Sequence, residues 1–85
     1  MEPVEINAGN WYLLAEDVDA WNADTRYRWS VREATTAEAV ADVTLMPDGA
    51  VSGSAREGED AALAAARRAV RGFAEAALGL TVRDA

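Results

Sequence analysis

Bulky apolar and charged side chains alternate through the segment RYRWSVRE, and this alternation restricts the fold more than any other feature of the chain. Successive side chains of a strand point to opposite faces, so the aromatic and β-branched residues share one face and the arginines the other. The segment Ala39–Leu45 alternates in the same way. Because a slip of one residue would turn the apolar side chains toward water, we expect Val31 opposite Ala41 and Trp29 opposite Val43. The two segments therefore predict an antiparallel hairpin with one buried face.

A third strand and a long helix are predicted after this hairpin. The sequence MPDGAV is typical of a tight turn in which Gly49 takes a positive φ, and this turn places Val51 opposite Leu45. The next strand, AVSGSA, has few large side chains, and its Gly53 indicates a bulge or a close backbone approach. Over Gly58–Leu78 the apolar residues recur at helical spacing. The expected buried stripe of this helix consists of Leu63, Ala66, Val70, Phe73 and Ala77.

The N-terminal region carries a mixed pattern. In NWYLLAEDVDAWNAD we predict a short strand over Asn10–Ala15 and a helical turn or loop over Asp17–Asn22, although the apolar spacing also fits a helix. Gly79 is suited to end the long helix, and LTVRDA can form another extended segment. The expected fold is α+β, with residues 1–85 as a single domain. It has an antiparallel three- to four-stranded sheet, one long C-terminal helix packed across it, and room for a short N-terminal helix.

The core of this domain must be small, because 20 of the 85 residues are alanine and each alanine removes little apolar area from water. Burial therefore depends on a few large side chains. The largest are Trp11, Trp21, Tyr27, Trp29, Leu45 and Phe73. Trp21 follows a polar stretch, so we expect it at the surface, where tryptophan often anchors an interface. The alternative is that Trp21 forms a lid over one end of the core.

The composition excludes several kinds of chemistry. The chain has no cysteine and no histidine, so it offers no thiol nucleophile, no thiolate zinc site and no imidazole base. The acidic pattern from Asp17 to Asp24 suggests a calcium loop, but Trp21, Asn22 and Arg28 stand where an EF-hand needs an oxygen ligand, a glycine and a bidentate glutamate. We therefore predict no catalytic residue, no metal site and no cofactor.

Charge is distributed unevenly along the chain, whose net charge is −7. Residues 1–60 hold thirteen acidic residues and four arginines, whereas residues 61–85 hold four arginines and two acidic residues. This balance repels phosphate backbones, so nucleic acid is not an expected partner, and a basic protein suits the surface better. No apolar run approaches the roughly 20 residues that span a bilayer, and the N-terminal residues lack a signal-peptide pattern. We expect a cytoplasmic protein with no membrane partner.

Two segments, YRWSVREATTAEAVADVTLMPDG and AARRAVRGFAEAALGLTVRDA, resemble the GNAT superfamily of N-acetyltransferases. In that family a W-x-V-x-x-x-x-T-x-x-x-V hairpin leads, after a further strand, to a helix that ends before the next strand. The matching residues are Trp29, Val31, Thr36 and Val40 in the hairpin, and Phe73, Ala74, Leu78, Gly79 and Leu80 at the helix end. The resemblance implies a shortened domain that binds acetyl-CoA at the start of the helix. Its pyrophosphate loop, Arg/Gln-x-x-Gly-x-Gly/Ala in the family, is matched in part by Arg56, Gly58 and Ala61.

Three carboxylates stand at this helix start and oppose a diphosphate there. Glu57, Glu59 and Asp60 would repel the phosphates, while acidic residues in a first helical turn stabilise the helix by themselves. We therefore predict no acetyl-CoA binding. Two other families resemble parts of the chain, namely the double-stranded-RNA-binding domain and the HicB-type antitoxin domain. The first of these normally needs basic residues where this chain is acidic.

The function expected from the sequence is binding rather than catalysis. The weak strand AVSGSA can leave a sheet edge open to a partner strand. We expect the partner surface to combine this edge with Arg26, Arg28, Arg32 and Trp21, and the partner to be another protein or a second copy of the chain. The alternative for the arginines is a solvent-facing surface that pairs across strands with Asp42 and neighbouring acidic residues. Similarly, Arg67, Arg68 and Arg71 can form an exposed helix face with local ion pairs.

Overall fold

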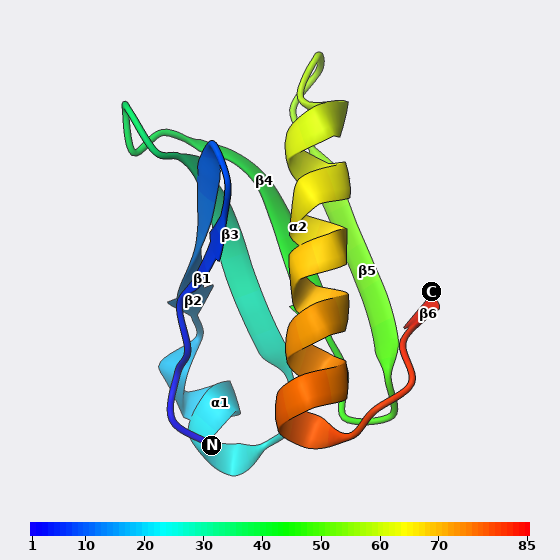
Figure 1. Cartoon of the computed structure of the whole chain (residues 1–85). Coiled ribbons are helices and arrows are strands. Elements are labelled where there is room, and N and C mark those ends of the chain that lie inside the picture. Colours follow the sequence, from blue (N-terminus) through cyan, green and yellow to red (C-terminus); the bar gives the residue numbers. More distant parts are fainter.

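The computed structural model describes all 85 residues and has one sheet with a helix lying across one of its faces (Figure 1). The sheet contains six strands in the order β1-β2-β3-β4-β5-β6. Neighbouring strands are antiparallel except β5 and β6, which are parallel. The elements are β1 (Ile6–Ala8), β2 (Trp11–Glu16), α1 (Val18–Ala23), β3 (Tyr27–Glu33), β4 (Ala39–Leu45), β5 (Ala50–Ala55), α2 (Asp60–Phe73), the π-helical turn η1 (Ala74–Leu78) and β6 (Arg83–Asp84).

The α+β class and the single long helix agree with the prediction from the sequence, but the sheet is larger and mixed rather than purely antiparallel. The additional strands are β1 and β6, with three and two residues. Strands this short carry little hydrophobic pattern of their own, so they form only where a longer neighbour supplies hydrogen-bonding groups. The short N-terminal helix is α1, and the strand before it is β2.

The register of the central hairpin is the one predicted: Val31 lies opposite Ala41, and Trp29 lies opposite Val43. The pairing then shifts at a bulge, so that Arg32 faces Ala39. The extra residue, Val40, turns into the core and is 2% exposed. Alternation alone assigns Val40 to the polar face, and the bulge reverses that assignment because it adds one residue to β4.

Tight turns join the strands on both sides of this hairpin. Gly49 has a φ of +96°, and Val51 lies opposite Leu45, as predicted. The β1–β2 hairpin closes in the same manner, because Ala8 faces Trp11 across a two-residue turn that begins with Gly9 at a φ of +69°. These glycines supply the positive φ that each turn needs.

Trp21 is part of the core, and its expected place on the surface is wrong; its position on α1, at one end of the sheet, fits the alternative that it covers one end of the core (Figure 1). Its side chain is 0% exposed, and its ring centroid lies 5.0 Å from those of both Tyr27 and Trp29. Its indole Nε1 donates a hydrogen bond to the carbonyl oxygen of Arg28 at 3.3 Å. The α1 helix begins and ends at left-handed residues, Asp17 and Asp24, which turn it back under the sheet. The aromatic ring therefore faces inward although its sequence neighbours are polar.

Small residues bring α2 close to the sheet. Ala62, Ala66, Val70 and Ala74 are all 0% exposed, whereas the larger Leu63 and Phe73 are only half-buried. The buried face of α2 is therefore rotated about the helix axis from the predicted one, so that alanines and Val70 replace Leu63 and Phe73 at its centre. Ala77, which was expected inside, is exposed, because the wider turn η1 changes the helical phase after Phe73. Gly79, at a φ of +64°, ends the turn as expected.

Candidate functional site

The helix covers one face of the sheet and leaves the opposite face without a covering element (Figure 1). We call this opposite surface the open face. The strand registers and side-chain alternation assign to it Tyr12, Leu14, Glu16, Arg28, Ser30, Arg32, Asp42, Thr44, Ser52 and Ser54. It is mainly polar, and its central residue, Ser30, is 7% exposed. The open face is the first candidate surface for a partner, because it holds two of the predicted arginines.

Two of the predicted arginines share one carboxylate. The Asp17 Oδ2 atom lies 2.9 Å from the guanidinium of Arg26 and 3.9 Å from that of Arg28. Arg28 lies on the open face, while Arg26 precedes β3 in an exposed loop. Trp21, the fourth residue of the predicted surface, lies in the core beneath them. The structure therefore brings the two arginines together around Asp17, but without an exposed tryptophan.

The third arginine, Arg32, belongs to a hydrogen-bonded row across the open face. Its Nε donates to the Ser30 hydroxyl at 3.1 Å, and that hydroxyl donates to Glu16 Oε2 at 2.7 Å. Its guanidinium also lies 3.8 Å from Glu16. Of the alternative pairing with Asp42 and neighbouring acidic residues, only the part with Asp42 is wrong, because Asp42 accepts a hydrogen bond from the Ser54 hydroxyl at 3.3 Å and forms no ion pair. The neighbouring acidic residues that pair with Arg28 and Arg32 are Asp17 and Glu16. All three arginines are thus compensated by carboxylates of the chain itself.

The outer edge of β5 is only half covered, because β6 pairs with Ala50 and Val51 alone. The C=O of Ala50 and the N–H of Arg56 bond toward β4, whereas the C=O of Val51 accepts a hydrogen bond from the β6 side. Backbone groups alternate in direction along a strand, so the N–H and C=O of Gly53 and Ala55 point away from β4. No strand pairs with these groups. We call this segment, Ser52–Ala55, the free β5 edge.

An ion pair keeps β6 at the first half of β5. Arg83 reaches the β4–β5 turn, where its guanidinium bonds to a side-chain oxygen of Asp48 and to the carbonyl oxygen of the same residue, both at 2.9 Å. The N–H of Ala50 donates to the other Asp48 oxygen at 3.0 Å. Both contacts lower the pKa of Asp48, and the hydrogen bond from Ala50 has the larger effect. We call these contacts between Arg83 and Asp48 the clamp. The free β5 edge begins after the residues of β5 that the clamp keeps paired with β6.

The residues suggested by the acetyltransferase resemblance lie apart from any enclosed site. Arg56 forms an ion pair with Glu38 and donates to the carbonyl oxygen of Ala39 at 3.3 Å, and the contact with Glu38 raises its pKa. It borders a shallow hollow of about 320 Å³ on the open face. Gly58, with a φ of +82°, and Ala61 are exposed and line no hollow. The helix start thus carries its acidic residues at an open surface.

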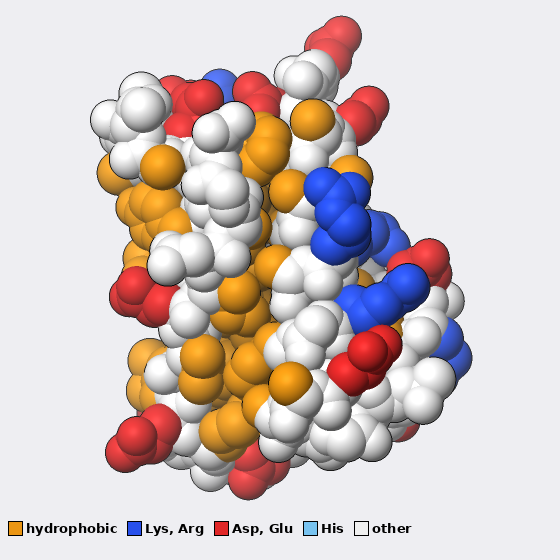
Figure 2. Space-filling model, in the orientation of Figure 1, with side chains coloured by type: hydrophobic (Ala, Val, Ile, Leu, Met, Phe, Trp, Pro, Cys, Tyr) orange, Lys and Arg blue, Asp and Glu red, His pale blue; other side chains and the backbone are white.

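Two of the three arginines of α2 have no acidic partner in the chain. Six of the eight arginines form ion pairs, and the two that do not are Arg68 and Arg71. Arg67 pairs with Asp84 of β6 at 2.9 Å. Of the local ion pairs expected on this helix face, one would join Arg71 to Glu75, four residues later, but none forms where η1 interrupts the α-helical geometry. Figure 2 shows the blue side chains gathered over α2 on the side of β5 and β6.

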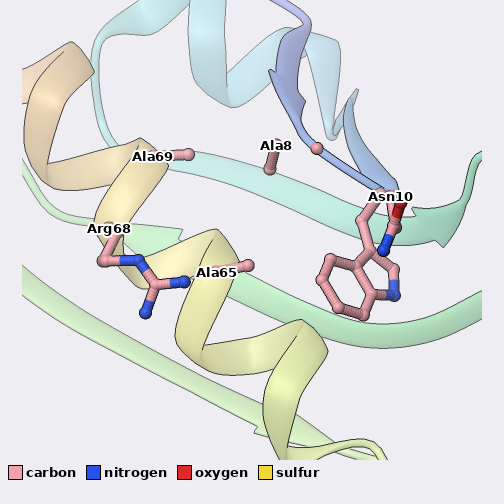
Figure 3. Close-up of a pocket in the computed structure, with 7 residues that line it drawn as sticks. Ala8, Asn10, Ala65, Arg68 and Ala69 are labelled. Atoms are coloured by element: carbon pink, nitrogen blue, oxygen red, sulfur yellow. The ribbon is translucent and has the colours of Figure 1, made fainter.

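A groove that the sequence did not predict lies between the β1–β2 hairpin and α2. Its volume is about 540 Å³. It is lined by Ala8, Gly9, Asn10, Trp11, Ala65, Arg68 and Ala69 (Figure 3). Trp11 is half-buried here, whereas Trp21 and Trp29 are 0% exposed. One sequence feature could have indicated the groove. Ala65 and Ala69 are one helical turn apart and present only methyl groups, and the β1–β2 turn opposite them contains Gly9.

No group of three acidic, histidine or cysteine side chains converges to hold a metal ion. None of the helices has the length and apolar character that crossing a bilayer requires. No protein-family model, no curated protein and no solved structure gives a significant match to the chain.

Proposed function

We propose that this chain is a small cytoplasmic binding domain that acts through a protein partner or a second copy, by adding an extended strand at the free β5 edge. The observation that supports this proposal is the outward direction of the N–H and C=O groups of Gly53 and Ala55. An exposed sheet edge with unpaired backbone groups is a template for another strand. The side chains along this edge are small, so an incoming backbone meets little obstruction.

Backbone pairing at two residues supplies up to four hydrogen bonds. Each such bond contributes about 0.5–1.5 kcal/mol net, so the edge alone supports only weak association. Side chains must therefore add to affinity. Within the free β5 edge, the side chains of Ser52 and Ser54 lie on the open face, where a partner can reach them. Arg28 and Arg32 lie farther across that face and are compensated by carboxylates, so they orient a partner and set the salt dependence more than the affinity.

Salt dependence separates the two kinds of partner. The chain carries a net charge of −7, so two copies repel each other and a basic protein is attracted. Added salt screens both effects. Self-association should therefore strengthen as salt rises from low to moderate concentration, whereas binding of a basic partner should weaken.

The test is a proline at Ala55, whose N–H points outward. Ala55→Pro removes one donor from the edge while leaving the bonds to β4 in place. Ala55→Val is the matched control, because it changes the side chain and keeps the N–H. We expect Ala55→Pro to lose self-association in light scattering, or capture of a specific protein from lysate, while Ala55→Val retains it. Equal behaviour of the two variants, both folded by circular dichroism, would contradict the proposal.

A second candidate is a reduced acetyl-CoA-dependent N-acetyltransferase-like domain. The element order supports it, because the β3–β4 hairpin is followed by β5, α2 and then β6. The acidic residues at the start of α2 and the contact of Arg56 with Glu38 oppose it. We expect isothermal titration calorimetry with acetyl-CoA to show no binding. Saturable binding at micromolar concentration would favour this candidate over the binding domain.

A further inference from the structure

We propose that the groove between the β1–β2 hairpin and α2 is a docking site for a peptide segment of a partner protein that carries an apolar side chain beside a carboxylate. The apolar side chain would lie against Trp11, and the carboxylate would pair with Arg68. This site goes beyond the free β5 edge, because its lining residues come from the β1–β2 hairpin and α2 and none comes from β5. The groove lies on the face of the sheet that carries the helix (Figure 3).

The walls of the groove leave space for a large apolar side chain. Ala8, Ala65 and Ala69 contribute only methyl groups, and Gly9 contributes no side chain. The volume of about 540 Å³ exceeds what a single aromatic side chain needs. Figure 2 shows a band of hydrophobic side chains at the surface between the N-terminal strands and α2. An aromatic ring is the preferred occupant, because it can pack edge-on or offset against the Trp11 indole.

The rim of the groove supplies a positive charge that nothing in the chain neutralises. Arg68 extends from α2 at one side of the hollow, and Asn10 lies at the hairpin side (Figure 3). Arg68 forms no ion pair in a chain that has fifteen acidic residues and eight arginines. Arg68 is exposed in the free chain, and a segment bound in the groove would remove its guanidinium partly from water, which strengthens the attraction to a carboxylate. The groove thus matches a segment with both an apolar side chain and an acidic one.

The experiment uses the whole chain, labelled with ¹⁵N, and titrates it with capped pentapeptides. The probe is Gly-Asp-Phe-Asp-Gly, and the controls are Gly-Lys-Phe-Lys-Gly and Gly-Asp-Ala-Asp-Gly. The readout is the indole N–H resonance of Trp11, assigned with Trp11→Phe, together with the backbone resonances of Ala65 and Ala69. We expect the probe to shift these resonances at millimolar concentration and both controls to shift them much less.

Charge reversal on α2 tests the assignment of Arg68. Arg71 is a matched control, because it is also unpaired and on α2 but does not line the groove; it lines only the hollow beside β6, which Arg68 borders as well. We expect Arg68→Glu to weaken binding of the acidic probe about fivefold or more, and Arg71→Glu to weaken it less than about twofold. Ala69→Leu, which fills the groove, should abolish the shifts while the fold is retained. Ala55→Pro should leave them unchanged, so this test is separate from that of the β5 edge.

Three results would overturn the proposal. The first is an equal effect of Arg68→Glu and Arg71→Glu, which would mean that only the general charge of α2 attracts the peptide. The second is a set of peptide-induced shifts at β5 instead of at the groove. The third is a concentration-dependent shift of the Trp11 indole without peptide, together with a dimer in light scattering, which would make a second copy the occupant.

Discussion

Replacing Gly53 with alanine tests the close approach of β5 to the backbone of β4 beneath α2. A Cβ atom at this position would lie 2.5 Å from the carbonyl oxygen of Asp42 and 2.9 Å from Leu63 Cδ1. Real Cβ atoms essentially never approach other heavy atoms closer than 3.0 Å, so something must move. The leucine can rotate, but the oxygen belongs to the backbone of β4. We therefore expect β5 or α2 to shift.

The magnitude follows from two opposing terms. A glycine with ordinary φ that becomes alanine loses freedom in the unfolded chain, which stabilises the folded state by about 0.4–1 kcal/mol. Overpacking a well-filled interior costs about 1–3 kcal/mol, and the steric term prevails because it involves backbone. Gly53→Ala should therefore destabilise the domain by about 1–2 kcal/mol net. For a domain of this size each kcal/mol lowers the melting temperature by about 4–8 °C.

The assay is urea unfolding followed by tryptophan fluorescence, with Gly72→Ala as the matched control. Gly72 lies in α2, where an added methyl group would meet no heavy atom within 4 Å, and its φ is not positive. Its replacement should stabilise the helix by about 0.5–1 kcal/mol. Replacing glycine with alanine should thus lower the stability at one position and raise it at the other. A Gly53→Ala variant as stable as the parent would refute the close approach of β5 to the backbone of β4 at this position.

Three further predictions follow from the core and the clamp at β6. Phe73→Ala should lower the free energy of unfolding by about 3 kcal/mol, because the ring packs edge-on to Trp29 at 5.7 Å; a loss below about 1 kcal/mol in urea would place it outside the core. The pKa of Asp48 is lower in the folded chain than in the unfolded one, so its stabilising contribution is complete above the unfolded pKa of about 4 and is lost as pH falls through the folded pKa. Asp48→Asn should accordingly reduce the acid sensitivity of the urea midpoint, and an unchanged pH profile would contradict the clamp with Arg83. Acrylamide should quench mainly Trp11, because the other two indoles are buried, and Trp11→Phe should remove most of that quenching.

The binding surface illustrates how far residue types can predict a site. The arginines Arg28 and Arg32 were expected on a polar strand face, and the structure places them there. Whether this surface is positively charged depends on Glu16 and Asp17, whose carboxylates compensate the two arginines. These carboxylates lie near the arginines only because β2 pairs with β3. The pattern of one strand does not show which acidic residue of a neighbouring element will reach an arginine. The expected partner Asp42 was therefore wrong, while the polar location of Arg28 and Arg32 and their pairing with neighbouring acidic residues were right.

The sequence did not predict the groove, and it left the burial of Trp21 open, for the same reason. Trp21 stands in a mainly polar segment, and its orientation is set by the left-handed residues that flank α1. The groove depends on the distance between the β1–β2 hairpin and α2, which no periodicity encodes. Both features arise from how separate elements are placed in space.

By itself the sequence determined the register of the β3–β4 hairpin, the Gly49 turn and the end of the helix at Gly79. Each depends on neighbours within a few residues: alternation with a period of two, a positive φ that glycine accepts, and the last turn of one helix. Only the tertiary structure decided the short strand β1, the parallel pairing of β6 with β5, the bulge at Val40 and the free edge of β5, although an extended segment was expected where β6 lies. A strand of two or three residues cannot hold its own backbone in place, so it forms where a distant strand already offers hydrogen bonds.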